Sequence, residues 1–200
     1  GDRGIAPESR VVPALLVLPG QRVDAIVTPR GRPLQELALR WVPYDRGYGS
    51  VEFRDEVDVL AIELVGPSLD EDPPAIPART VEPISIEGAT RFDLELTQRM
   101  EGDRLVMGFD GVPSWEATPV PASIGDTHVW TFRNTIDWAH PIHLHGYFFQ
   151  RIDAAGRVVP EWFDTIDVPV DGSASFVVRY DDRPGMWMIH CHVLDHADAG

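Results

Sequence analysis

Two short histidine-rich segments near the end of this 200-residue sequence carry the residues best suited to chemistry. The first reads His140-Pro141-Ile142-His143-Leu144-His145-Gly146, and the second reads His190-Cys191-His192-Val193-Leu194-Asp195-His196. Together they hold all but one of the 7 histidines and the only cysteine. Imidazole nitrogens and a cysteine thiolate are common ligands of transition metals, so this clustering predicts a metal centre.

Strand geometry divides these ligands into two sets, because side chains alternate between the two faces of a β-strand. In such a strand His143 and His145 share one face. His190 and His192 also share a face, and Cys191 between them points the opposite way. Two His-x-His strands lying side by side would present four imidazoles to one place. That number of ligands suits two or more metal ions rather than one.

The second set lies on the other face. His140 points away from His143 if the strand alternates regularly through the intervening proline, and His196 can return to Cys191 through a turn. A cysteine with two histidines is the ligand set of a blue-copper electron-transfer centre. The thiolate is then joined to both neighbouring histidines by a short covalent path. The predicted catalytic residues are accordingly Cys191, His190 and His192.

A structural zinc site is the simplest alternative for these residues, since zinc also accepts cysteine and histidine. Structural zinc needs four ligands, and seven ligands on two faces exceed that number. Copper is therefore the favoured metal. The remaining histidine, His128, stands alone in a strand-like run and is predicted to be structural.

Short strand-like runs separated by glycine and proline turn signals predict an all-β protein. These runs cover residues 11–18, 22–27, 37–42, 57–64, 91–97, 104–109, 127–134, 143–152, 174–180 and 186–192. The spacing of the later runs favours a sandwich or a barrel. Prolines gather between residues 66 and 83, which predicts a semi-rigid linker between two β domains.

The composition excludes several kinds of partner. The 17 basic and 32 acidic residues give a formal net charge of −15, which would repel nucleic acid and anionic lipid. A run of about 18 apolar residues is absent, so no membrane span is predicted, and no signal peptide is visible. The single Cys191 excludes an intrachain disulfide and is a candidate metal-binding thiolate.

In combination, the two histidine segments resemble the C-terminal domain of the multicopper oxidases, a family that includes the laccases. Gly185-Met186-Trp187 and the segment from Phe163 to Pro169 are also similar to this family. The resemblance is strong over residues 84–200 and weaker over residues 11–64, which look like a middle domain. It implies cupredoxin-like Greek-key β-sandwich domains: a partial middle domain at residues 1–77 and a C-terminal domain at residues 78–200.

By this resemblance, the type 1 copper ligands are His140, Cys191 and His196, the type 2 ligand is His143, and the type 3 ligands are His145, His190 and His192. In the family, type 1 copper takes electrons one at a time from a small reducing substrate, and the trinuclear cluster of type 2 and type 3 copper reduces dioxygen to water. The resemblance implies a laccase-like oxidoreductase acting on phenols, aromatic amines or metal ions. It also implies a secreted protein, in the periplasm or outside the cell.

The sequence departs from the family pattern in three places. The trinuclear cluster takes eight histidines in the family, whereas this sequence offers four. The other four come from an N-terminal cupredoxin domain in the family, and such a domain is the expected partner of this chain. The axial type 1 position would be residue 201, beyond Gly200. Ala197 stands where some bacterial members place a glutamate that helps proton supply, so Asp195 or Asp198 is expected to serve instead.

Other interpretations of the sequence stay open. The chain could be a copper-binding or structural cupredoxin protein without turnover, although the complete ligand set argues against that. A nitrite reductase is a rival enzyme, but its second domain lacks the pair of His-x-His motifs. Asp164 and Asp167 could be surface turn acids, or they could hydrogen-bond a ligand imidazole or lie on a proton path.

Overall fold

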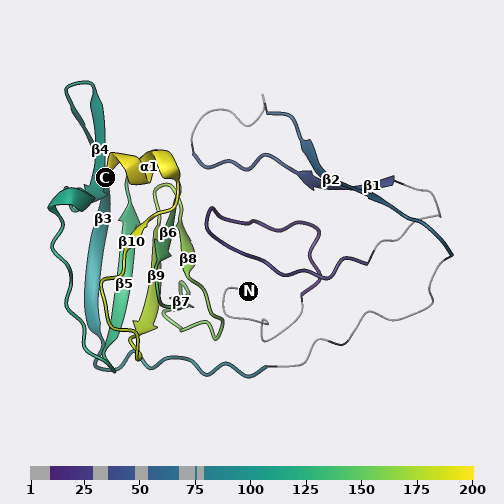
Figure 1. Ribbon diagram of the computed structural model, residues 1–200. Coiled ribbons are helices and arrows are strands. Elements are labelled where there is room, and N and C mark those ends of the chain that lie inside the picture. Colours follow the sequence, from purple (N-terminus) through teal and green to yellow (C-terminus); the bar gives the residue numbers. More distant parts are fainter. Residues whose placement is uncertain (1–9, 29–35, 48–53, 68–74, 76–78) are drawn as a thin grey trace.

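Two β-sheets stacked face to face make up the later part of the chain in the computed structural model, which describes residues 10–28, 36–47, 54–67, 75 and 79–200 (Figure 1). The larger sheet has the order β4 (Arg104–Phe109), β3 (Thr90–Glu101), β5 (Thr127–Asn134), β9 (Ser173–Arg179) and β7 (Gln150–Ile152). The smaller has the order β10 (Ile189–Cys191), β6 (His140–Leu144) and β8 (Thr165–Val168). Among the strands that the structure describes, only β3 and β5 pair in parallel. The predicted all-β sandwich is confirmed.

The core lies between the two sheets and is built from the inward-facing side chains of both. Phe132 and Phe176 from the larger sheet and Ile142 and Val168 from the smaller one are fully buried. Phe149 stacks on Phe176 with 4.0 Å between ring centroids. Apolar area removed from water on this scale is the main source of stability in such a sandwich. It gives the histidine-bearing strands a rigid support.

A separate hairpin, β1 (Glu36–Trp41) and β2 (Val57–Glu63), lies well apart from the two sheets (Figure 1). These two strands were predicted and are confirmed. The strands predicted at residues 11–18 and 22–27 are wrong, since residues 10–28 are irregular apart from the predicted turn at Pro19-Gly20. A strand forms only by pairing, and no strand within the described ranges pairs with this segment.

The sandwich also differs from prediction near the histidines. The single strand predicted at residues 143–152 is wrong, because the chain leaves β6, turns at Gly146 with φ +74° and enters the other sheet as β7. The strand predicted at 186–192 shortens to β10, and helix α1 (Leu194–Ala199) follows. Strand β8 and the 3-10 helix η2 (Ser114–Glu116) were not predicted. The remaining predicted strands are confirmed.

The predicted boundary between residues 77 and 78 lies outside the described residues. The division into two domains therefore stays a prediction. In the part of the chain that the structure describes, no helix is long and apolar enough to cross a membrane.

Candidate metal centre

The pairing of β10 with β6 places the two histidine segments side by side. His190 lies opposite His143, and Cys191 lies opposite Ile142. On the other edge of β6, His140 lies opposite Val168. Because side chains alternate along each strand, this register gathers His143 and His190 on one face and turns Cys191 to the other.

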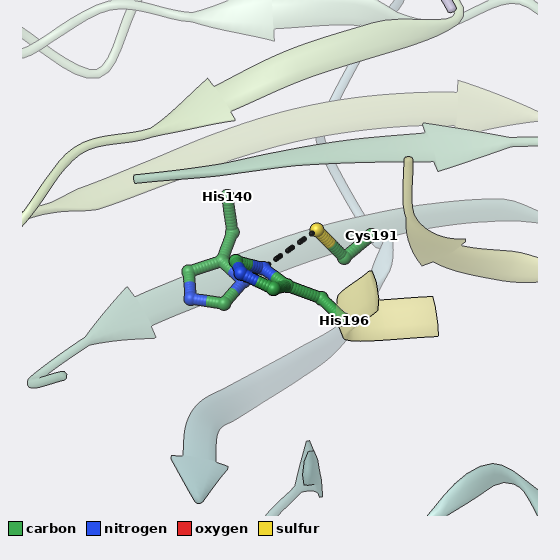
Figure 2. Close-up of side chains that lie close together, drawn as sticks. All are labelled: His140, Cys191 and His196. Atoms are coloured by element: carbon green, nitrogen blue, oxygen red, sulfur yellow. Dashed lines mark hydrogen bonds between the residues drawn. The ribbon is translucent and has the colours of Figure 1, made fainter. Parts of the chain in front are cut away.

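On that other face, His140, Cys191 and His196 converge from three different elements (Figure 2). The Cys191 Sγ lies 3.6 Å from the His196 Nδ1, and the Nδ1 atoms of His196 and His140 are 3.3 Å apart. One ligand atom from each residue lies within 4.8 Å of the others. His196 returns through helix α1 rather than through the predicted turn, and its ring stacks on Trp138 with 4.7 Å between centroids.

Burial sets the protonation of these three groups. His140 and His196 are 3% and 9% exposed. Burial, reinforced by the charges of His196 and Arg46, lowers the pKa of His140 to about 3. Burial and Arg46 lower the pKa of His196 to about 4, and burial raises the pKa of the Cys191 thiol to about 11. Both imidazoles are therefore neutral near pH 7, with lone pairs available to a metal ion.

The donor set fits a soft transition metal such as copper. Two imidazole nitrogens that face each other at 3.3 Å, with a partly buried sulfur beside them, match in kind the nitrogen and thiolate ligands that blue-copper centres use. Metal binding would take the proton from Cys191, because the thiolate and not the thiol is the ligand. The convergence of the three side chains was predicted, and the structure has it. That they bind copper stays a prediction.

The other four histidines gather on the opposite face of β6 and β10. The ring centroid of His143 lies 4.9 Å from that of His145, 5.8 Å from that of His190 and 5.3 Å from that of His192. The Nε2 atoms of His145 and His190 are 3.0 Å apart. Two imidazoles bound to one ion can have this separation. The predicted second group of ligands is thus brought together in space.

Hydrogen bonds fix the tautomers of two of these rings. The Thr165 hydroxyl donates to the Asp164 carboxylate at 3.0 Å, so its oxygen accepts from the His143 Nδ1–H at 3.0 Å. The His190 Nδ1–H donates to the Cys191 carbonyl at 2.8 Å. Each of these two histidines therefore keeps the lone pair on Nε2. Asp164, only 6% exposed, is joined through Thr165 to the predicted ligand His143 and is not a surface turn acid.

The described segment at residues 10–28 also contacts this group, which sequence reasoning missed. The Arg22 Nη1 lies 2.6 Å from the Asp164 Oδ2 and donates to the Gly20 carbonyl at 2.9 Å. Gly20 has φ +83°, and a Cβ there would lie 2.5 Å from the His192 ring. The Pro19-Gly20 signal predicted the turn but not its position against a histidine about 170 residues later, a position that depends on the tertiary fold.

The acids proposed as proton donors lie on helix α1. Asp195 and Asp198 are both exposed, and the charge of Asp195 acts to raise the pKa of His196. Asp167, on β8, is partly buried, and burial raises its pKa. A role for any of these three in proton supply stays a prediction.

We expect the metal-free chain to lose stability as the pH falls from about 7 to about 5. The fold lowers the pKa of His140 to about 3 and that of His196 to about 4, whereas unfolded histidines titrate near about 6.5. Between these values the unfolded state binds more protons, so each imidazole removes up to about 1.4 kcal/mol of stability per pH unit. Urea unfolding across this range measures the slope. His140→Gln should reduce this slope. An unchanged slope in that variant would contradict the lowered pKa of His140 in the folded chain.

Comparisons with known proteins agree with this geometry. A family model described as multicopper oxidase matches residues 87–200. Copper resistance protein A of Escherichia coli is 33% identical over 123 residues, which cover 62% of this chain and 20% of that protein. The multicopper oxidase MmcO of Mycobacterium tuberculosis is 35% identical over 91 residues, covering 46% of this chain and 18% of that protein. The chain therefore spans about a fifth of the length of these relatives.

Solved structures share the fold. The 2F4 variant of the multicopper oxidase McoA from Aquifex aeolicus has a TM-score of 0.68 and 23% identity, covering 85% of this chain and 40% of that chain. A laccase from Pediococcus acidilactici has a TM-score of 0.62 and 23% identity, covering 84% and 35%. The fold is thus the cupredoxin-like β-sandwich of these enzymes. Because the family model matches more than half of the chain and includes both histidine segments, this chain belongs to the multicopper oxidase family.

Proposed function

We propose that this chain is the C-terminal portion of a laccase-like multicopper oxidase and that His140, Cys191 and His196 hold its type 1 copper. The observation that carries the proposal is the convergence of one thiol and two neutral imidazoles, all within 4.8 Å, in a largely buried position. Bound copper supplies one-electron redox chemistry, which none of these side chains offers alone. The protein contributes the geometry and excludes water from the ligands.

The four remaining histidines are proposed to be half of the trinuclear cluster. His143 would be a type 2 ligand, and His145, His190 and His192 would be type 3 ligands. The close packing of their rings supports this assignment. An N-terminal cupredoxin domain of the same enzyme would supply the other half. In this proposal, residues 1–77 are part of a middle domain and residues 78–200 form the C-terminal domain.

Cys191 is placed to connect the two sites. Its side chain belongs to the first ligand set, while its chain neighbours His190 and His192 belong to the second. The hydrogen bond from the His190 Nδ1–H to the Cys191 carbonyl, 2.8 Å long, adds a route through the same residue. With copper bound, we propose that the first site would supply one-electron chemistry toward a small reducing substrate, that the second would supply it toward dioxygen, and that the bonds of Cys191 would connect the two ligand sets. The proposed substrates are phenols, aromatic amines or metal ions, and the proposed location is the periplasm or the extracellular space.

A copper titration of this chain tests the type 1 assignment. We expect an intense visible absorption band that saturates at one copper per chain, because only a thiolate ligand gives this band. His140→Ala should weaken or shift the band. His128→Gln is a matched control, since His128 is a buried histidine outside both ligand sets. A chain that binds copper without the band would refute the assignment.

Asp164→Asn should weaken copper binding at the four-histidine group by about 10- to 100-fold, the usual cost of losing a partner of a ligand. The amide can donate to Thr165, which would reverse the hydrogen bond that keeps the His143 lone pair on Nε2. The substitution also removes the charge that pairs with Arg22. Chelator competition on the enzyme with its N-terminal domain measures the affinity of this group, while the type 1 band should not change.

Asp93→Asn is the control for that measurement. Asp93 is an exposed aspartate that pairs with Arg133 at 3.3 Å on the larger sheet, so its loss removes the same charge away from the histidines. Equal copper affinities in both variants would show that Asp164 does not position His143.

A further inference from the structure

We propose that Arg46, from the segment before the β-sandwich, is a positioning residue of the type 1 site that raises its reduction potential. The inference rests on the proposed function, because it concerns the copper that His140, Cys191 and His196 would hold. Arg46 lies outside both histidine segments, and nothing in its sequence context marks it as part of a metal centre.

Two hydrogen bonds tie Arg46 to the strand that carries His140. The Ala139 N–H donates to the Arg46 carbonyl at 2.8 Å, and the Arg46 Nη2 donates to the Ala139 carbonyl at 3.2 Å. Ala139 is buried and directly precedes His140. Both the main chain and the side chain of Arg46 therefore hold Ala139, and the position of Ala139 fixes the backbone of the next residue, His140.

The turn that holds Arg46 is itself locked in place. The Asp45 carboxylate accepts the Gly47 N–H at 2.8 Å. Gly47 has φ +75°, and a Cβ at this position would lie 2.2 Å from a methyl carbon of Val170 and 2.6 Å from the Asp137 carbonyl. A glycine is required by both the backbone conformation and the close approach. Arg46 thus has little freedom to move away from the site.

The Arg46 guanidinium donates to the carbonyl of Ala139, the residue before His140, so its positive charge lies close to the proposed ligands. It acts in one direction on all three of them, lowering the pKa of His140, of His196 and of Cys191. Two carboxylates oppose it: Asp167 on β8 acts to raise the pKa of the Cys191 thiol, and Asp195 on α1 acts to raise that of His196. Arg46 is partly buried, so its field is less screened than that of a surface arginine.

A fixed cation favours the reduced form of such a site. Reduction adds one electron and lowers the positive charge of the metal with its ligands by one unit. A neighbouring guanidinium repels the oxidised form more strongly than the reduced form. Arg46 should therefore make the site a stronger oxidant of its substrate, and this effect differs from simply holding the ligands in place.

The test is a redox titration of the copper-loaded chain, with the visible band followed against a soluble one-electron mediator. Arg46→Gln keeps a hydrogen-bond donor and removes the charge, and we expect it to lower the equilibrium constant for reduction about tenfold. A tenfold change is about 59 mV for one electron. Arg46→Lys keeps the charge and should restore most of the potential. Arg40→Gln removes an equal charge from β1, where Arg40 pairs with Asp58 and Glu56, and should leave the potential unchanged.

Each outcome decides the matter. Equal potentials in the Arg46→Gln and Arg40→Gln variants overturn the inference while leaving the proposed function intact. The absence of the band in the unaltered chain removes both. If Arg46→Gln loses the band or does not fold, the potential of Arg46→Lys decides: a value near that of the unaltered chain supports the role of charge. A low potential in this variant, or its failure to fold as well, would overturn the inference and leave Arg46 with a purely structural role.

Discussion

Cys191→Ser should abolish the visible band of the copper-loaded chain and, in the complete enzyme, the oxidation of reducing substrates. The serine hydroxyl is a hard, weakly acidic ligand, whereas the thiolate is the soft ligand that the site offers to copper. The two side chains are similar in size, so the packing around His140 and His196 should change little. The expected loss is complete, because Cys191 is the only cysteine and no other thiolate can replace it.

Absorption spectra and copper content of purified Cys191→Ser protein measure this effect. Circular dichroism and urea unfolding of the metal-free variant are the controls for folding. In the complete enzyme the four-histidine group should keep its copper, because none of its ligands has changed. A band of undiminished intensity would refute the type 1 assignment.

Residues 1–200 alone should not reduce dioxygen to water. The sequence has 7 histidines, and only His143, His145, His190 and His192 gather at the second site. By resemblance to the family, eight are needed there. Copper ions held by four imidazoles would be under-coordinated and open to solvent, so their binding should be weak. Carboxylates of this acidic chain could also hold copper loosely without forming a cluster.

Oxygen uptake by the copper-loaded chain with a phenolic reductant measures the activity. Addition of the N-terminal domain in trans should restore turnover if that domain docks and completes the cluster. The chain with His143→Ala, given the same domain, is the matched control and should stay inactive. Sustained four-electron turnover by the 200-residue chain alone would contradict the prediction and would indicate completion by another route, for instance a second copy of the chain.

The division of the predicted ligands into two groups could be predicted from the sequence because the relevant rule is local. Alternation along a strand fixes that Cys191 points away from His190 and His192, whatever the strand packs against. The same rule placed His140 and His143 on opposite faces of β6. Short-range turn signals likewise identified most strands of the sandwich and the turn at Pro19-Gly20.

The prediction of strands failed where a strand depends on another strand to pair with. The apolar run at residues 11–18 and the polar–apolar alternation at residues 22–27 are typical of strands, yet these residues are irregular in the described structure. Periodicity describes one strand and cannot say whether another strand is available to pair with it. The break between β6 and β7 was also missed, because the change of sheet at Gly146 is a property of the whole sandwich.

The sequence by itself determined which side chains are offered as metal ligands and how they divide between two faces. The tertiary structure alone decided the register of β10 on β6, the approach of Gly20 and Arg22 to the four histidines, and the position of Arg46 beside Ala139. Contacts between residues about 45 to 170 positions apart leave no periodic signal in the chain. They form only when burial of the shared core fixes the packing of the elements, because that gain outweighs the entropy of closing such long loops.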